Sequence, residues 1–419
     1  MKPNRRRSFL KIALQSLNLV LCSGFLQAAD WPQWRGANRD GKAAGFDAPQ
    51  TWPKELKQKW KVTVGDGVAT PALVGDKLYV FSRQEVSEII RCLDAGSGKE
   101  VWQEKYETGG ASGPASGFSG PRSSPAVADG KVVTLGVRGM LSCEDAATGK
   151  KLWRKDDFQA WPQFHPSSSP MIVDGLCIAQ LGGRENGAIV AYDLGSGEQK
   201  WKWTGESPGY SSPALMTVDG SKLIVALTEK KIVAVSAADG KLAWETPFAG
   251  QGMGGYNAAT PIVEGQTLIY SGAGRGVKAV KIEKASDGYA AKELWSNPEK
   301  SVQFNTPVLK NGLLYGMTQR YELFCINAQN GQTAWATELP QGTGGGGRGP
   351  ATASIVDVGS ALVILTPNGE LAAFEPSDKA YKELARIKVA DTATHAQPVL
   401  SGHRVFIKDK DSVMLLALE

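Results

Sequence analysis

Short apolar runs alternate with tight-turn residues along most of this chain. Residues 125–154 contain four such runs, separated by turns at Asp129-Gly130, Arg138-Gly139 and Thr148-Gly149-Lys150. Asp-Gly and Gly-Lys pairs between β-rich runs are typical of hairpins, because Gly and Asp tolerate positive φ. No stretch after the first thirty residues keeps a 3.6-residue apolar period. The pattern therefore predicts an all-β fold.

Two sequence markers recur together along the chain. In the first, a polar residue is followed eight positions later by Trp, as in Asp94–Trp102, Asp145–Trp153, Asp193–Trp201, Ser236–Trp244 and Asn327–Trp335, with a looser copy ending at Trp295. In the second, a small or hydroxyl residue precedes Pro and an apolar run, at Pro71, Pro125, Pro170, Pro213, Pro261, Pro307 and Pro398, with a degenerate copy at Ala353. Seven steps from Pro71 to Pro398 give (398 − 71)/7, a period of about 47 residues. A period near 45 with four runs per repeat predicts the blades of a β-propeller.

Counting the second marker predicts eight four-stranded blades. The last repeat, from Pro398 to the chain end at Glu419, has room for only about three strands. We expect the segment Leu56–Val64, which contains Trp60, to supply the missing outer strand and close the ring. The sequence then divides into an export signal (1–29), a leader (30–53) and the propeller (54–419). Because Trp31 lies outside the repeats, Trp31→Ala is expected to cost much less stability than Trp153→Ala.

The first marker, Asp-x-x-(Thr/Ser)-Gly-Lys-x-x-Trp at Asp94–Trp102 and Asp145–Trp153, resembles the tryptophan-docking motif of pyrroloquinoline-quinone (PQQ) repeat propellers. A large ring on an outer strand can cover the tight turn of the next blade, where Gly leaves room. The structural docking residues are predicted to be Trp60, Trp102, Trp153, Trp201, Trp244, Trp295 and Trp335. The resemblance extends over residues 31–419 and implies either a quinone-dependent dehydrogenase or a non-catalytic propeller similar to the outer-membrane-assembly lipoprotein.

The first 29 residues have the features of a secretory signal. Basic residues at Arg5–Arg7 precede an apolar stretch at 12–25 and small residues at Ala28-Ala29, a stretch too short for a membrane span. Arg6-Arg7-Ser8-Phe9-Leu10-Lys11 resembles the twin-arginine export motif, which predicts a periplasmic or otherwise exported bacterial protein. An ordinary Arg-rich signal is the alternative, and a lipidated Cys22 is disfavoured by Leu21 before it.

The net charge of the chain depends on whether the predicted signal is included. The formal net charge of +5 comes from Lys2, Arg5, Arg6, Arg7 and Lys11, so the remainder carries 47 − 5 = 42 basic and 42 acidic residues. A neutral propeller has no electrostatic footprint for nucleic acid or anionic lipid. No transmembrane span follows the signal, and a monomer is expected.

The cysteines have the pattern of packing residues. Cys92, Cys143 and Cys325 occupy one repeat position, filled by Ala191 and Ala234 in other blades, and Cys177 lies elsewhere. Equivalent positions in different blades should be too far apart for a bridge, so free buried thiols are expected. The adjacent Cys-Cys pair that quinone dehydrogenases of this fold commonly carry is absent from the sequence, as is a haem-type Cys-x-x-Cys-His.

Polar residues precede most of the Pro markers, and the Gly-rich loops at 109–121, 250–255 and 342–349 are long. Innermost strands line a propeller's channel, so these side chains are predicted to converge on one mouth. The candidate ligand- or partner-binding residues are Arg122, His165, Tyr210, Asn257, Asn305, Arg348 and His395. The alternative is that these residues, with Ser123-Ser124, Ser168-Ser169 and Ser211-Ser212, satisfy backbone groups at strand ends.

The cationic members of this set favour an acidic ligand whose affinity rises as pH falls from about 7.5 to 6. Few acids lie near the predicted mouth, and the nearest, Glu185, is expected on the opposite face. No catalytic or metal-ligating residue is assigned and no cofactor is predicted. The sequence therefore favours an exported, non-catalytic propeller that binds an unidentified protein partner or an acidic small ligand. The alternative is a PQQ-dependent alcohol or sugar dehydrogenase, which would require PQQ and Ca²⁺.

Overall fold

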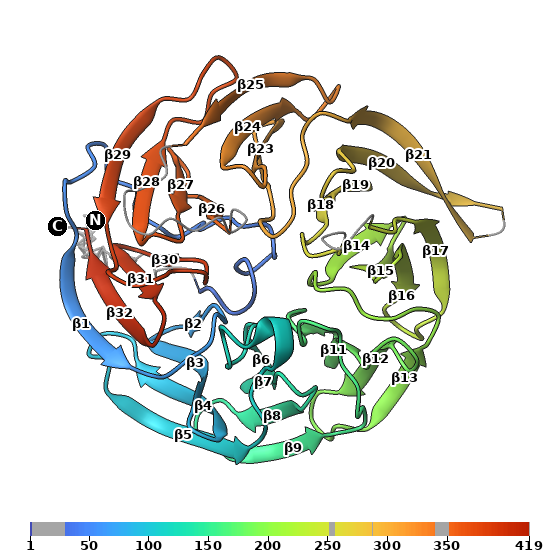
Figure 1. The fold of residues 1–419 in the computed structure, drawn as a ribbon, viewed down its shortest axis with the longest axis horizontal. Coiled ribbons are helices and arrows are strands. Elements are labelled where there is room, and N and C mark those ends of the chain that lie inside the picture. The colour runs from blue at the N-terminus through green and yellow to red at the C-terminus, as the bar shows by residue number, and fades with distance from the viewer. Residues whose placement is uncertain (2–29, 251–255, 287, 340–351, 419) are drawn as a thin grey trace.

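The computed structural model describes residue 1 and residues 30–250, 256–286, 288–339 and 352–418. These residues form 32 strands in eight four-stranded antiparallel sheets, arranged as a ring around a central channel (Figure 1). The described part contains one helical turn, the 3₁₀ turn η1 (Gly113–Ala115). The predicted all-β, eight-bladed propeller is confirmed. Of the predicted export signal (1–29), residues 2–29 lie outside the described residues.

Blades 1 to 4 follow one another along the chain. Blade 1 consists of β2 (Ala72–Val74), β3 (Lys77–Gln84), β4 (Ser87–Asp94) and β5 (Glu100–Glu107). Blade 2 consists of β6 (Ala126–Ala128), β7 (Lys131–Leu135), β8 (Leu141–Asp145) and β9 (Lys151–Lys155). Blade 3 consists of β10 (Met171–Val173), β11 (Leu176–Leu181), β12 (Ala188–Asp193) and β13 (Gln199–Trp203). Blade 4 consists of β14 (Ala214–Val218), β15 (Ser221–Leu227), β16 (Lys231–Ser236) and β17 (Leu242–Pro247).

The remaining blades complete the ring. Blade 5 consists of β18 (Ile262–Glu264), β19 (Thr267–Ser271), β20 (Val277–Ala285) and β21 (Gly288–Asn297). Blade 6 consists of β22 (Val308–Lys310), β23 (Leu313–Met317), β24 (Glu322–Asn327) and β25 (Thr333–Glu338). Blade 7 consists of β26 (Ser354–Asp357), β27 (Leu362–Leu365), β28 (Glu370–Phe374) and β29 (Glu383–Lys388). Blade 8 consists of β30 (Val399–Ser401), β31 (Arg404–Lys408), β32 (Ser412–Ala417) and β1 (Lys57–Thr63).

Blade 8 combines strands from the two ends of the sequence. β1 pairs antiparallel with β32 and places Trp60 opposite Leu415. The sheet order β1-β32-β31-β30 makes β1 its outermost strand. Ring closure therefore depends on backbone hydrogen bonds between segments more than 300 residues apart in the sequence.

Six of the seven predicted docking tryptophans reach the turn of the next blade. Their indole Nε1 atoms donate to backbone carbonyl oxygens there, over 2.7–3.1 Å: Trp60 to Ala95, Trp102 to Ala146, Trp153 to Leu194, Trp201 to Ala237, Trp295 to Ala328 and Trp335 to Ser377. At Gly149, whose φ is +72°, an added Cβ would come within 2.4 Å of the Trp102 ring. The turn thus requires Gly both for its backbone conformation and for the space that the indole occupies.

Except for Trp60, which faces Leu415, each docking tryptophan lies opposite a small residue on the adjacent strand. Trp102, Trp153 and Trp335 pair with Cys92, Cys143 and Cys325, while Ala191 and Ala234 face Trp201 and Trp244. The four cysteines of the described residues are free and buried, as predicted. Burial raises the pKa of Cys92 to about 11, so these thiols are packing groups and are protonated at neutral pH.

Two blade joints depart from the docking pattern. In blade 5 the long β20–β21 hairpin replaces the short turn and extends beyond the ring (Figure 1). Trp244 is accordingly only partly buried, and it packs on the same apolar cluster as Tyr289 of that hairpin. Between blades 7 and 8, Ala385 occupies the position that Trp fills elsewhere, opposite Ala373. That joint is held instead by the largest apolar cluster of the molecule.

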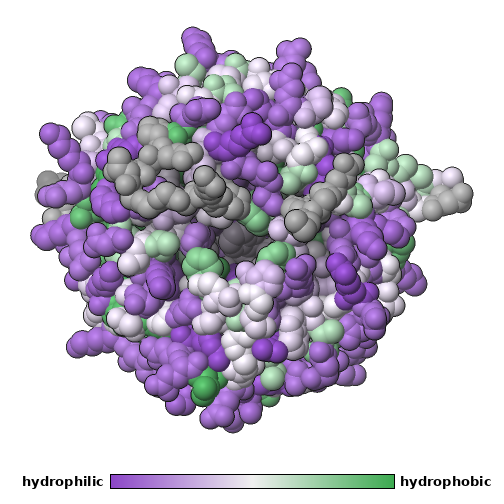
Figure 2. All heavy atoms as spheres, in the orientation of Figure 1, coloured by the Kyte–Doolittle hydropathy of each residue, from purple (hydrophilic) through white to green (hydrophobic). Residues whose placement is uncertain are grey.

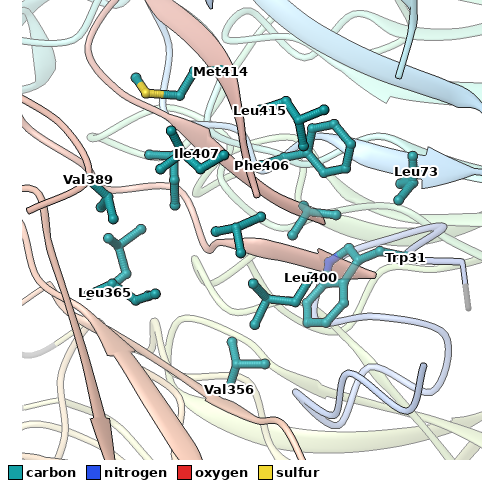
Figure 3. Packing of buried hydrophobic residues seen from close by; sticks show 14 of the residues in the cluster. Trp31, Leu73, Val356, Leu365, Val389, Leu400, Phe406, Ile407, Met414 and Leu415 are labelled. Atoms are coloured by element: carbon teal, nitrogen blue, oxygen red, sulfur yellow. The ribbon is translucent and has the colours of Figure 1, made fainter. Parts of the chain in front are cut away.

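The leader is part of this cluster, and its expected minor role is wrong. Trp31 is 1% exposed and packs among residues of blades 1, 7 and 8, including Leu73, Val356 and Leu400 (Figure 3). Its backbone exchanges two hydrogen bonds of 2.8 Å with Leu73. The repeat pattern could not predict this, because Trp31 lies outside every repeat, yet its side chain is as buried as those of the docking residues.

Leader residues bond to seven of the eight blades. Backbone groups between Trp31 and Asp47 bond to blades 1, 2, 7 and 8, through Leu73, Val127, Asp357 and Gly402. The Arg39 guanidinium donates to carbonyl oxygens of Ser169 and Pro170 in blade 3, and Trp34 Nε1 donates to Thr260 Oγ1 in blade 5. Arg35 donates to carbonyl oxygens of Thr306 and Pro307 in blade 6. The leader therefore acts as a central plug that ties the inner strands together.

The hydroxyl residues before the Pro markers form a hydrogen-bonded girdle around the channel. The backbone N–H of one blade donates to the side-chain hydroxyl at the same position of the next, over 2.9–3.1 Å: Gln397 to Thr70, Thr70 to Ser124, Ser124 to Ser169, Ser169 to Ser212, and Thr260 to Thr306. The structural alternative for these hydroxyl residues is thus the correct one. They satisfy N–H groups that the short inner strands leave unpaired.

Candidate functional site: the funnel and its aromatic chamber

One face of the ring carries the loops that enter the inner strands, and we call it the funnel face. Figure 2 views this face and shows a hollow at its centre. A groove of about 1360 Å³ lies over blades 2 to 4, lined by residues that include Trp161, Arg184 and Lys230. A chamber of about 520 Å³ lies beside it at the channel. Phe164, Tyr210 and Tyr256 line both, so groove and chamber form one continuous funnel.

Seven aromatic rings of the described residues line the chamber. Trp34 of the leader contributes to one end, while Phe118, Phe164, Tyr210, Tyr256, Phe304 and His395 come from loops of six segments. Tyr256 is in ring contact with Phe164, Tyr210 and Phe304 at centroid distances of 5.0, 5.5 and 6.3 Å. Phe118 meets His395 edge-on at 4.8 Å. Aromatic pairs in these geometries stabilise each other and present flat apolar faces to the space between them.

Four of the seven predicted mouth residues line the chamber: Arg122, Tyr210, Asn305 and His395. Arg122 is already engaged, because its terminal nitrogens donate to the carbonyl oxygens of Ala115, Phe118 and Gly120 over 2.8–3.1 Å. It holds the loop 109–120 in place, so its expected role as a free anion-binding group is not supported. Arg348 lies outside the described residues.

His165 and Asn257 are buried and serve the backbone. Asn257 Nδ2 donates to the carbonyl oxygens of Thr228 and Phe248. His165 is 2% exposed, with Nδ1 2.8 Å from Val137 O and Nε2 accepting from Ser112 N–H at 3.0 Å. Because a carbonyl accepts and a backbone N–H donates, the neutral Nδ1–H tautomer is the one that satisfies both partners. Asn257 also lines the groove, whereas His165 lines neither groove nor chamber, so the structural alternative holds for His165.

Burial also changes the expected pH response of the two histidines. The pKa of His165 is lowered, first by burial and then by the nearby cations Arg122 and Arg138. Burial likewise lowers the pKa of His395. Both rings are therefore neutral at pH 7 and gain their protons below the reference value near 6.5. The expected rise in affinity for an acidic ligand between pH 7.5 and 6 does not follow from these groups.

Sequence reasoning missed the aromatic lining. In three segments the ring directly precedes a selected polar residue: Phe164-His165, Tyr256-Asn257 and Phe304-Asn305. The backbone turns at Phe164-His165, where His165 has a φ of 64°. His165 and Asn257 are buried, whereas Phe164 and Tyr256 line the chamber. The available signal was an aromatic residue directly before a polar one in the loops that enter the inner strands.

The acids of the funnel lie in the groove. Glu185, at the β11–β12 turn, lines the groove together with Phe164 and Tyr210. Its expected position on the opposite face is wrong, because loops between second and third strands share the face of those that enter the inner strands. Glu185 and Glu229 are matched by Arg184 and Lys230, and Arg184 pairs with Glu229 at 3.4 Å. The charges of the groove are therefore balanced.

The chamber's donor set does not fit PQQ with Ca²⁺. Calcium takes oxygen ligands, chiefly carboxylates, and no Asp or Glu is among the described residues that line the chamber. No group of three or more His, Cys, Asp or Glu side chains that could hold a metal occurs in the described ranges. Separately, none of the helical segments described is long and apolar enough to span a bilayer.

Comparisons with known proteins agree with this fold. The outer membrane protein assembly factor BamB of Burkholderia pseudomallei is 24% identical over 370 residues, covering 85% of this chain and 86% of that protein. A quinohemoprotein alcohol dehydrogenase of Comamonas testosteroni is 29% identical over 157 residues, which cover 36% of this chain and 22% of that enzyme. A solved europium-containing methanol dehydrogenase superposes with a TM-score of 0.70 at 14% identity, over 93% of this chain and 98% of that one. That likeness shows the shared fold.

The family match covers more than half of the chain. The model described as outer membrane protein assembly factor BamB matches residues 86–337, which contain blades 2 to 5, all but the last residue of blade 6 and the two outer strands of blade 1. This chain therefore belongs to the PQQ-like propeller family of the outer membrane protein assembly factor BamB.

Proposed function

We propose that this protein is an exported, monomeric and non-catalytic propeller that acts as a binding scaffold, with the funnel face as its binding surface. The observation that carries the proposal is the continuity of the groove and the aromatic chamber. Concave surfaces that combine aromatic rings with a few polar groups are the usual binding sites of proteins. The BamB relative, an outer membrane assembly factor by name, supports a scaffold role and an exported location.

The groove suits a protein segment better than a highly charged partner. Its aromatic residues Trp161 and Tyr210 lie among side chains of both charges. Aromatic anchors surrounded by a polar, charge-balanced rim are typical of protein interfaces. Electrostatic steering contributes little here, so the affinity should depend only weakly on salt.

A photo-crosslinking amino acid in place of Gln163 tests the binding surface. Gln163 is exposed and lines the groove. Exposed Lys222 is the second residue of β15, on the opposite face, and serves as the matched control position. In cells that make each variant, a discrete adduct is expected from position 163 alone. Adducts from position 222 alone, or from neither position, would refute the funnel-face assignment.

The competing hypothesis is a PQQ-dependent oxidoreductase, favoured by the partial match to the quinohemoprotein alcohol dehydrogenase. The test is to incubate the purified protein with PQQ and Ca²⁺, followed by gel filtration and a dye-reduction assay with alcohols and sugars. We expect no quinone absorbance to co-elute and no dye reduction. Stoichiometric quinone together with dye reduction would establish the enzyme hypothesis and overturn ours.

A further inference from the structure

The chamber beneath the groove has the composition of a small-molecule site, whatever binds above it. Its volume of about 520 Å³ lies within the range of roughly 300–1,000 Å³ typical of ligand pockets. We propose that it binds an uncharged, flat ring compound that carries an amide-like pair of one hydrogen-bond acceptor and one donor. This inference deepens the proposed binding function by naming the class of ligand.

The arrangement of the aromatic side chains in the chamber favours a flat ligand. Phe164, Tyr256 and Phe304 form a connected group, and Phe118 with His395 forms a second one in the same lining. A flat ring inserted between such groups gains stacking or edge-to-face contact and removes apolar surface from water. A branched aliphatic compound would forgo the stacking contribution.

The ligand is expected to be uncharged, because no carboxylate is among the described lining residues and the charge of Arg122 is already compensated. A cation would meet no carboxylate among the described lining residues. An anion would meet an Arg122 whose terminal nitrogens donate to three carbonyl oxygens and whose charge is balanced by Asp66 and Glu88. An isolated charge in such an apolar space is strongly disfavoured.

Two amide side chains provide the polar complement. Asn305 is 4% exposed and Gln397 is 3% exposed, and both line the chamber. Asn305 Nδ2 and Gln397 Oε1 have no hydrogen-bond partner within the described residues. Buried polar atoms are rarely left unpaired, because each costs stability. A ligand with a carbonyl acceptor and an N–H donor could satisfy this donor and this acceptor after small side-chain rotations.

Three probes that share one ring test the charge selectivity: benzamide (neutral), benzoate (anionic) and benzyltrimethylammonium (cationic). Binding to the full-length protein at pH 7.5 is measured by saturation-transfer NMR with titration. We expect benzamide to bind with a Kd on the order of 1 mM, the range for a fragment of this size, and the two ions at least tenfold more weakly. Equal or tighter binding of either ion, or undetectable benzamide binding, would refute the proposal.

Substitutions in the chamber lining test whether benzamide binds there. Ala258 lines it, so Ala258→Phe should fill the space and abolish benzamide binding. Gln397→Met removes the unpaired acceptor at similar volume and should weaken binding about tenfold, the effect of losing one hydrogen bond. Gln180→Met is the matched control, since Gln180 Oε1 is equally buried and unpaired but its side chain is not part of the chamber lining. It should leave the Kd unchanged.

Near-ultraviolet circular dichroism checks that each variant remains folded. Benzamide binding that persists in Ala258→Phe would show that the probe binds elsewhere, and the proposal would fail. Failure here is separable from failure of the scaffold proposal, because the adduct at position 163 depends on the groove and not on the chamber.

Discussion

At the scale of single residues, the tryptophans divide into two structural classes. Those of the repeats each bridge one blade joint, as Trp153 does through Leu194. Trp31 belongs to no repeat, yet it packs in the cluster that joins blades 7, 8 and 1. Burial, rather than membership of a motif, therefore determines the contribution of each indole to stability.

Trp31→Ala and Trp153→Ala should destabilise the protein to a similar extent, by about 3–5 kcal/mol each, the usual cost of truncating a large buried aromatic. Trp31 is 1% exposed and Trp153 is 7% exposed. Denaturant unfolding measures both values. Trp161→Ala, at a partly exposed groove residue, is the control and should cost much less. A cost at Trp31 close to that of the control would show that the leader only rests against the ring.

His165 should make the loop 109–120 sensitive to acid. Its folded-state pKa is depressed, so the stability it provides is complete above the unfolded value near 6.5 and is lost as pH falls below that value. Protonation places a hydrogen on Nε2, facing the Ser112 N–H that it now accepts from. Arg122 and Arg138 face the ring, and Asp66 and Glu88 lie near Arg122, so the added positive charge is unfavourable.

Hydrogen exchange of the peptide that contains Ser112, corrected for intrinsic rates, should accelerate between pH 7 and pH 5. Global stability should fall over the same interval, because the unfolded chain binds the proton more tightly than the folded protein does. His165 has a φ of 64°, which Asn tolerates, so His165→Asn is the suitable variant and should remove the pH dependence of exchange. Equal acceleration in this variant would assign the effect to another group.

At the scale of elements, six blade joints combine an indole on the outer strand of one blade with a turn of the next, and at five of them a left-handed Gly lies under the indole: Gly98, Gly149, Gly197, Gly240 and Gly331. At one of these joints Gly149 lies under Trp102. Where the short turn is replaced by the long β20–β21 hairpin, Trp244 is only partly buried. Close packing of the indole therefore depends on the turn of the next blade.

Gly149→Ala and Gly130→Ala separate the contact with the indole from the backbone conformation of the turn. Both glycines have positive φ, +72° and +68°, but only at Gly149 would the new Cβ meet an indole, at 2.4 Å. Gly130→Ala should cost about 1 kcal/mol for backbone conformation alone. Gly149→Ala should cost about 2–4 kcal/mol, because the Trp102 ring must also move. Thermal melts with matched denaturant titrations measure the difference, and equal costs would show that the indole contact is unimportant.

At the scale of the whole molecule, two structural features close the ring. β1 completes blade 8 from the other end of the sequence. The leader enters the channel and bonds to seven blades through residues that include Arg35 and Arg39. Repeat proteins are held mainly by contacts between neighbouring units. The plug adds contacts between blades that are not neighbours and so couples the ring as a unit.

Deleting residues 30–48 leaves β1 (Lys57–Thr63) intact and tests the plug separately from ring closure. The variant should unfold at a lower temperature than Trp31→Ala and in a broader transition, because contacts with seven blades are lost together. Deleting residues 30–64 also removes β1 and should destabilise further by opening blade 8. A wild-type melting profile for the shorter deletion would contradict the central role of the leader.

The repeats determined the fold from the sequence alone. Period, turn residues and the spacing of the docking motif are local properties that each blade satisfies independently, so eight blades and six of seven docking contacts could be predicted. The position of the cysteines was equally predictable, because the tryptophans of most blades face a small residue on the adjacent strand, as Trp153 faces Cys143. Local repetition makes such inferences reliable.

Only the tertiary structure decided what occupies the channel and which side chains face it. The leader has no repeat to compare with, and its contacts, such as Arg39 to Pro170, join segments 131 residues apart. The orientation of the side chains at the channel mouth could not be predicted either, because neighbouring residues such as Phe164 and His165 point in different directions. Sequence places both at the funnel, whereas the backbone path determines that the ring lines the chamber and the imidazole supports the loop.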